Sequence, residues 1–154
     1  MIRVAIASPQ ESIEIERALM RQAVRAVLAS EGVNDAEISL AFVDNSTIRE
    51  LNRRYLNHDE PTDVLSFPLG ESKQKGLAGE IVVGVEVALA QAKERGHSVE
   101  AELALYVIHG VLHLCGYDDK TAGGAAEMRK AERRYLQELN LPNVAPTDPG
   151  ECAP

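Results

Sequence analysis

The residues of this 154-residue chain with the clearest chemical potential are His109 and His113, which are followed closely by Asp118 and Asp119. Residues four positions apart lie on the same face of a helix, so these two imidazoles can bind one metal ion. Gly116 can end the helix in a left-handed turn. That turn would bring one of the carboxylates back toward the histidines as a third ligand. Three protein ligands leave one position open for water, so the pattern predicts a catalytic zinc-type site whose reactive group is a metal-bound water.

The segment that carries the histidines has the composition of a buried helix. Ser98 is placed to cap its start, and Cys115 is expected to be an apolar filler on another face. Buried polar side chains need partners, and a metal ion would satisfy both rings. Apolar residues cover most of the predicted helix, which indicates burial on nearly all sides: Leu103, Leu105, Val107, Ile108, Val111, Leu112 and Leu114.

Four short strands interleaved with five helices are predicted around this helix. The expected class is α+β, an α/β sandwich built on a small mixed four-stranded sheet. We expect one domain over residues 1–140 and a disordered proline-rich tail over residues 141–154. The predicted strands are Ile2–Ala7, Glu37–Val43, Val64–Phe67 and Glu80–Val83, with a polar loop over residues 70–79. The other predicted helices follow a capping box at Ser8–Glu11 or cover Ser46–Tyr55, Val85–Arg95 and Ala125–Leu139.

The overall charge and the cysteines narrow the class of protein. Sixteen basic and 24 acidic residues give a net charge of −8, which argues against a nonspecific nucleic-acid binder but leaves room for a local basic groove. Cys115 and Cys152 do not form a disulfide framework. No 20-residue apolar span is present. We therefore expect a cytoplasmic protein without a membrane partner.

The stretch from His109 to Asp119 resembles the signature H-G-x-L-H-L-x-G-Y-D-H of the YbeY family of bacterial endoribonucleases, also described as rRNA maturation factors. The similarity spans roughly residues 40–139. A second family motif is matched by Leu51-Asn52, Tyr55, Asp59 and Pro61 to Pro68. The family's glycine–acid–isoleucine strand is matched by Gly79-Glu80-Ile81.

This resemblance implies a metal-dependent endoribonuclease that acts on single-stranded RNA. The implied partners are rRNA and the ribosomal small subunit, with roles at the 3′ end of small-subunit rRNA and in ribosome quality control. The family holds Zn²⁺ with three histidines; His109 and His113 match two of them, and Asp119 stands at the third position. A carboxylate adds negative charge, which should raise the pKa of a metal-bound water, and it also admits Mn²⁺ or Fe²⁺. Zinc remains the expected ion.

A second departure is Leu56, where many family members have an arginine that is thought to serve activity. One hypothesis is that Arg54 or His58 takes over the phosphate-facing role, and the alternative is that both are ordinary surface residues. Asp118 is expected either to orient a histidine ring or to cap the next helix. The family places the end of the third strand beside its cleft, so Ser66 and Phe67 are expected in the substrate wall.

Two other functions compete with the nuclease. Gly110 stands where a peptidase of the HExxH type has its glutamate base, which argues against a metal-dependent hydrolase of peptides. The second alternative is a non-enzymatic ribosome assembly factor in which the metal stabilises the fold. The sequence does not choose between a metal hydroxide and the 2′-hydroxyl of the substrate as nucleophile, and it does not give the oligomeric state.

Overall fold

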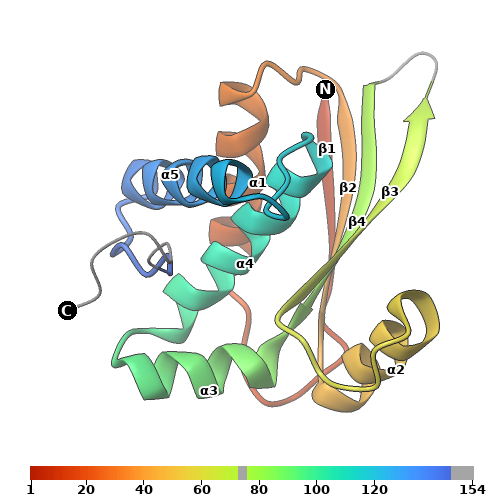
Figure 1. The fold of residues 1–154 in the computed structure, drawn as a ribbon, viewed down its shortest axis with the longest axis vertical. Coiled ribbons are helices and arrows are strands. Elements are labelled where there is room, and N and C mark those ends of the chain that lie inside the picture. The colour runs from red at the N-terminus through yellow and green to blue at the C-terminus, as the bar shows by residue number, and fades with distance from the viewer. Residues whose placement is uncertain (73–75, 147–154) are drawn as a thin grey trace.

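A four-stranded sheet with helices on both faces organises the computed structural model, which describes residues 1–72 and 76–146 (Figure 1). The strand order is β1-β2-β4-β3, with β1, β2 and β4 parallel and β3 antiparallel at one edge. The strands are β1 (Ile2–Ala7), β2 (Ala36–Val43), β3 (Val64–Ser72) and β4 (Gly76–Gly84). The helices are α1 (Arg17–Ser30), α2 (Asn45–Leu56), α3 (Val85–Arg95), α4 (Val99–Leu114) and α5 (Ala122–Glu138). The predicted mixed sheet with five helices is confirmed.

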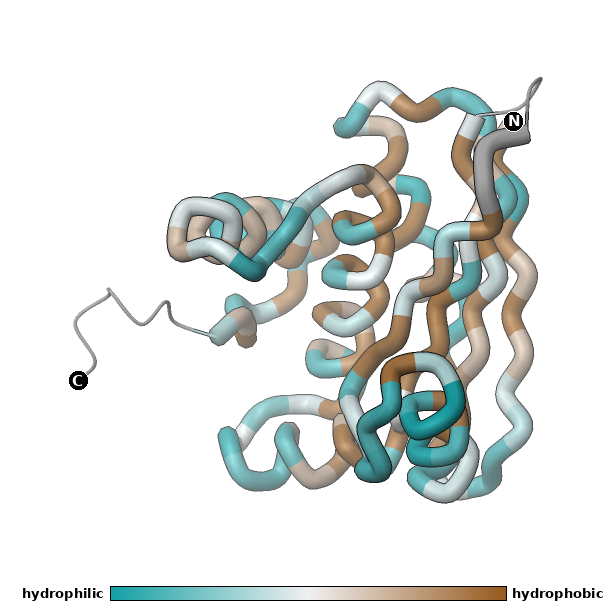
Figure 2. Tube along the Cα trace, turned by 45° about the vertical axis from the view of Figure 1, so that its right-hand side comes forward, coloured by the Kyte–Doolittle hydropathy of each residue, from teal (hydrophilic) through white to brown (hydrophobic). Residues whose placement is uncertain are grey.

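Helix α4 occupies the centre of the molecule. It contacts β3 and β4 on one side and α1, α3 and α5 on the others, as its all-round apolar composition requires (Figure 1). The strands carry alternating hydrophobic and hydrophilic residues (Figure 2). Helix α2 covers the other face of the sheet, where a smaller apolar cluster forms from Val43, Ile48, Leu65 and Val82. The chemically active residues of α4 are therefore carried by the most enclosed helix of the fold.

Two local predictions are wrong. Helix α1 begins at Arg17, not after the predicted capping box, because the Gln10 side chain bonds to Ser8 Oγ and to the backbone of Ile13 and so stabilises a loop. The predicted loop over residues 70–79 is also too long, since β3 continues to Ser72 and β4 begins at Gly76. Polar residues can pair as strands in an exposed hairpin, and composition alone does not exclude this.

The chain remains packed on the domain for some distance after α5. Val144 and Ala145 are buried, and Arg95 Nη2 donates a hydrogen bond of 2.9 Å to the carbonyl oxygen of Val144. Part of the segment that was expected to be a disordered tail therefore contributes to the core. The rest of that predicted tail, residues 147–154, lies outside the described residues. Over the described ranges, none of the helices is long and apolar enough to cross a membrane.

Candidate metal centre

The candidate ligands lie at the end of α4 and in the turn that follows it. Ser98 caps the start of α4 by accepting a hydrogen bond of 3.2 Å from the N–H of Ala101, as predicted. His109 and His113 stand one turn apart near the other end. Gly116 then adopts a φ of +102°, which confirms the predicted left-handed turn. This turn leads the chain back so that Asp119 faces both histidines.

The three side chains bring one ligand atom each to a common point. His109 Nε2 lies 3.0 Å from His113 Nε2 and 3.6 Å from Asp119 Oδ2, and His113 Nε2 lies 3.7 Å from the same oxygen. Zinc bonds of about 2.0–2.1 Å in a tetrahedron place neighbouring ligand atoms about 3.3 Å apart. The spacing and the chemistry of these three donors therefore fit a zinc ion.

Glu132 of α5 orients the first of these histidines. Its fully buried carboxylate accepts a hydrogen bond from His109 Nδ1 at 2.5 Å, while Arg129 Nη1 donates to its other oxygen at 2.7 Å. An Nδ1 that donates to a carboxylate leaves Nε2 with its lone pair free for a metal. Glu132 was not predicted from the sequence. The available signal was an acidic residue in the apolar stripe of α5, between Met128 and Tyr135.

The environment of His113 favours the neutral imidazole that a metal ligand requires. Burial lowers the pKa of His113, and the neighbouring His109 lowers it further. Asp118, which was considered as an orienting residue, accepts a hydrogen bond of 2.9 Å from the N–H of Lys120 within the turn. This local bond is a structural role, and the histidine ring that has a buried carboxylate partner is oriented by Glu132 instead.

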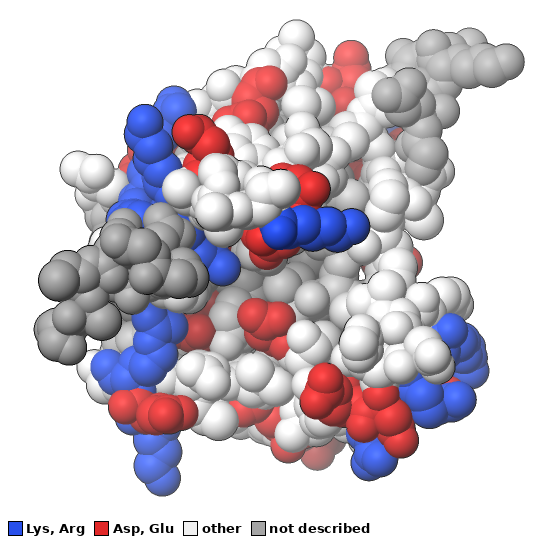
Figure 3. All heavy atoms as spheres, viewed as in Figure 1, with Lys and Arg blue, Asp and Glu red and all other residues white. Residues whose placement is uncertain are grey.

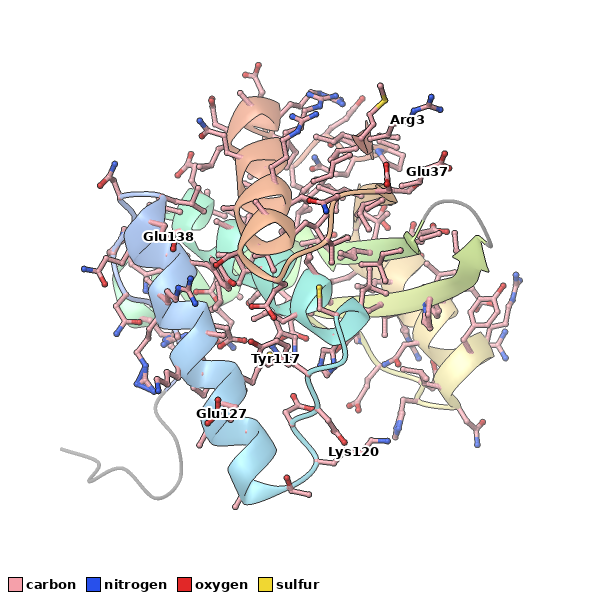
Figure 4. All side chains as sticks on the ribbon, turned by 90° about the horizontal axis from the view of Figure 1, so that it is seen from above. Arg3, Glu37, Tyr117, Lys120, Glu127 and Glu138 are labelled. Atoms are coloured by element: carbon pink, nitrogen blue, oxygen red, sulfur yellow. The ribbon has the colours of Figure 1, made fainter. Side chains whose placement is uncertain are left out.

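A single carboxylate ties together the elements that carry the centre. Glu31 Oε2 accepts hydrogen bonds from the hydroxyl groups of Tyr117, at 3.1 Å, and Tyr135, at 2.7 Å. Tyr117 belongs to the turn that holds Asp119 and extends between the end of α4 and α5 (Figure 4). Burial, with a further contribution from Glu31, raises the pKa of Tyr135 to about 12, and the same two causes raise the pKa of Tyr117. Both hydroxyl groups therefore keep their protons at neutral pH and can donate to Glu31. The contact with Glu31 fixes the turn relative to α1 and α5.

Gly124 allows the turn to lie directly against the start of α5. A Cβ at this position would stand 2.0 Å from the carbonyl oxygen of Asp118, a backbone atom that cannot rotate away. The neighbouring Gly123 faces open space, because a Cβ there would meet nothing within 4 Å. The absence of a side chain at Gly124 is thus a condition for the position of Asp119.

We expect Gly124→Ala to displace this turn. The overlap should cost about 1–3 kcal/mol of unfolding free energy and weaken zinc binding about tenfold or more, because Asp119 moves with the backbone of Asp118. Thermal unfolding and a zinc competition titration measure the two effects. Gly123→Ala is the matched control and should be neutral or stabilise the helix by up to about 1 kcal/mol. Equal zinc affinity in the two variants would contradict this account.

A cleft of about 500 Å³ opens beside the centre, and Figure 3 shows the molecule hollowed near the middle of this face. His109 and Asp119 line it at one end, and side chains of α3 and α5 line its walls. Among the described residues in its lining, the arginines are Arg95 and Arg129. The metal centre is therefore accessible to a ligand of small-molecule or nucleotide size.

Known proteins resemble this chain over most of its length. The family model described as Endoribonuclease YbeY matches residues 5–140. The chain is 41% identical over 139 residues to Endoribonuclease YbeY of Carboxydothermus hydrogenoformans, covering 88% of this chain and 96% of that protein. It is 44% identical over 149 residues to Endoribonuclease YbeY of Alkaliphilus oremlandii, covering 91% and 99%. The chain belongs to the YbeY endoribonuclease family. The resemblance seen in the sequence is confirmed, and the enzyme class is that of a hydrolase of phosphodiester bonds.

A solved structure supports the fold assignment for this YbeY family chain. The solution structure of a protein from Thermotoga maritima, 28% identical, superimposes with a TM-score of 0.60 and covers 99% of this chain and 100% of that one.

The two residues expected in the YbeY substrate wall lie on opposite faces of β3. Ser66 Oγ donates a hydrogen bond of 3.2 Å to the carbonyl oxygen of Gly110, so Ser66 faces the helix of the metal centre. Phe67 packs edge-to-face against Tyr55 of α2, with ring centroids 5.3 Å apart. Successive strand residues point to opposite faces, which explains the separation. Ser66 is thus the one on the α4 side of the sheet, and neither residue belongs to the described lining of the cleft.

The cationic residues considered as replacements for the family arginine lie outside the cleft. Arg54 is 3.7 Å from Glu50 on the exposed side of α2, and His58 is exposed in the loop that follows. Leu56 itself is 52% exposed. Neither Arg54 nor His58 belongs to the described lining of the cleft, whereas Arg129 and Arg95 do. The geometry consequently brings different arginines into the cleft, with Arg129 beside the candidate centre and Arg95 further along.

Proposed function

We propose that this chain is a zinc-dependent endoribonuclease of single-stranded RNA that acts in the cytoplasm on the ribosomal small subunit. There it would mature the 3′ end of small-subunit rRNA and take part in ribosome quality control. The observation that carries the proposal is the convergence of His109, His113 and Asp119 in a chain of the YbeY endoribonuclease family. Their donor set and spacing support zinc, with Mn²⁺ and Fe²⁺ as the ions to compare.

The protein side chains have separate tasks in this proposal. His109, His113 and Asp119 would hold the ion, which when bound supplies Lewis-acid stabilisation to a scissile phosphodiester. Glu132 keeps His109 in the tautomer that presents Nε2 to the ion. Ser66 fixes the close approach of β3 to α4 through the Gly110 carbonyl. Gly110 offers no side-chain base at the position that peptidases of the HExxH type use, which favours RNA over a peptide as substrate.

The proposal is tested with precursor small-subunit rRNA and the purified full chain. Mapping of 3′ ends should show cleavage with Zn²⁺, loss of cleavage with a chelator, and recovery when zinc is restored. Parallel reactions with Mn²⁺ and Fe²⁺ identify the ion that supports the fastest turnover. Absence of cleavage with all three ions would overturn the enzymatic proposal.

A complementation experiment separates catalysis from a purely structural role in ribosome assembly. In a bacterial strain that lacks its YbeY enzyme, the parent chain should restore mature 3′ ends and His109→Ala should leave precursors. A folded His109→Ala variant that restores normal maturation would instead support a non-enzymatic assembly factor.

A further inference from the structure

The cleft beside the metal centre extends along α4 to the end of α3. His109 lines it at one end and Glu102 at the other, seven positions apart on α4. Seven residues of helix correspond to about 10 Å, so the cleft is longer than the metal centre itself. A substrate held only by the ion would leave most of this length unused.

Arg129 lies at the end of the cleft that adjoins the metal centre. Its side chain is 21% exposed, and Nη1 is anchored at 2.7 Å to the buried carboxylate of Glu132. A guanidinium has five N–H donors in a rigid plane, and this bond uses one of them. Glu132 therefore holds the Arg129 group in place beside His109 while other donors remain for a ligand in the cleft.

Arg95 occupies the far end. Nη2 donates to the carbonyl oxygen of Val144, Nη1 lies 3.8 Å from the carboxylate of Glu102, and a third of the side chain is exposed. Glu102 is itself buried and in contact with His97, so its charge is engaged within the protein. Arg95 is thus also fixed by protein partners and retains donors toward the cleft that it lines.

We propose that Arg129 and Arg95 form a two-point phosphate track for single-stranded RNA, with Arg129 at the phosphate next to the metal centre and Arg95 at the backbone further along. The inference rests on the proposed function, because it takes RNA as the substrate. Fixed, partly desolvated guanidinium groups are the side chains best suited to phosphate oxygens. The described lining also holds the carboxylates of Asp63, Glu102, Asp119 and Glu132, so in a chain of net charge −8 these two guanidinium groups are the cationic points of an otherwise acidic cleft.

The salt dependence of RNA binding tests the track directly. Each phosphate neutralised in single-stranded RNA contributes about −0.7 to the slope of log K against log salt. Arg95→Gln and Arg129→Gln should each reduce the magnitude of this slope by about 0.7 and weaken binding about tenfold at low salt. The probe is a fluorescent, single-stranded 2′-O-methyl oligonucleotide, which is titrated with the zinc-loaded full chain. A gel run after the titration shows whether the probe has remained intact.

Arg3→Gln is the matched control for the loss of one positive charge. Arg3 is 71% exposed on β1, where its nearest acidic partner is Glu37 at 3.8 Å, and it points away from the α4–α5 side of the molecule (Figure 4). This variant should retain the parent slope. Arg95→Lys should recover the slope, since a lysine keeps the charge, which separates phosphate contact from loss of the bond to Val144. Circular dichroism melting and zinc content show whether each variant is folded and loaded.

Kinetics on a cleavable RNA distinguish the two positions. Arg95→Gln should raise KM about tenfold with kcat nearly unchanged, because the contact is remote from the reacting phosphate. Arg129→Gln should lower kcat as well. If both glutamine variants are folded and zinc-loaded and keep the salt slope of the parent chain, the phosphate track is overturned. The proposed nuclease function would not be affected by that result. Failure of the parent chain to bind or cleave RNA would instead overturn the track together with the proposed function.

Discussion

His113→Ala is expected to abolish stoichiometric zinc binding and to slow RNA cleavage by about 10³-fold or more. The substitution removes one of three candidate ligands, each about 3–4 Å from the others. Loss of several kcal/mol of electrostatic stabilisation at a phosphodiester corresponds to a rate effect of this size. The helix should survive, since His113 is only half-buried near the end of α4 and alanine is a good helix former.

Zinc content after dialysis and single-turnover cleavage of a short RNA measure these effects. His113→Cys restores a zinc ligand of another type and should recover metal binding, which separates ligand loss from a packing defect. Asp119→His should keep zinc and lose affinity for Mn²⁺, because imidazole is a poorer ligand than carboxylate for harder ions. If the His113→Ala protein is folded and retains as much zinc as the parent chain, the assignment of His113 as a ligand is refuted.

The part of the centre that could be predicted from the sequence is the part set by local geometry. His109 and His113 are related by helix periodicity, and Gly116 lies two residues beyond the helix end, so the approach of Asp119 follows from a turn of a few residues. The family signature covers the same short segment. The apolar surroundings of this segment likewise predicted a buried helix, and α4 is the most enclosed helix in the molecule.

The supporting residues could not be predicted in the same way. Glu132 is 23 positions from His109, and Glu31 is 86 positions from Tyr117, so their contacts arise from the packing of α5 and α1 around α4. The sequence offered Asp118 as the nearest carboxylate, whereas the side chain that reaches the ring comes from another helix. Asp118 accepts a hydrogen bond within its own turn, and only tertiary packing determines which acid becomes buried beside the ring.

The separation of Ser66 from Phe67 shows a different limit. Family resemblance placed both in one wall, although strand alternation directs neighbouring residues to opposite faces of a sheet. With α4 on one face and α2 on the other, the alternation directs Ser66 to Gly110 of α4 and Phe67 to Tyr55 of α2. The helix that each residue faces could be assigned only once β3 was known to be an edge strand between two helical layers.

Glu132→Gln is expected to weaken zinc binding by about 10–100-fold while the three candidate ligands remain in place. The carboxylate accepts hydrogen bonds from both His109 Nδ1 and Arg129 Nη1, one on each oxygen. An amide has one oxygen and one NH₂ group, so it can accept from only one of these donors and must oppose the other. If the NH₂ faces His109, the ring shifts its proton to Nε2 and no longer presents a lone pair to the metal.

A zinc competition titration and thermal melts with and without zinc measure the consequence. A ligand that binds only the folded state raises its stability in proportion to the logarithm of its affinity, so the zinc-dependent gain in Tm should shrink in Glu132→Gln. Glu127→Gln is the matched control, since Glu127 is an exposed acid on the same helix (Figure 4). The same zinc affinity in both variants would mean that Glu132 serves only the packing of α5. Weakening confined to Glu132→Gln would establish that His109 depends on the hydrogen-bond acceptor that Glu132 supplies from α5, because the control changes the helix charge equally and leaves the ring untouched.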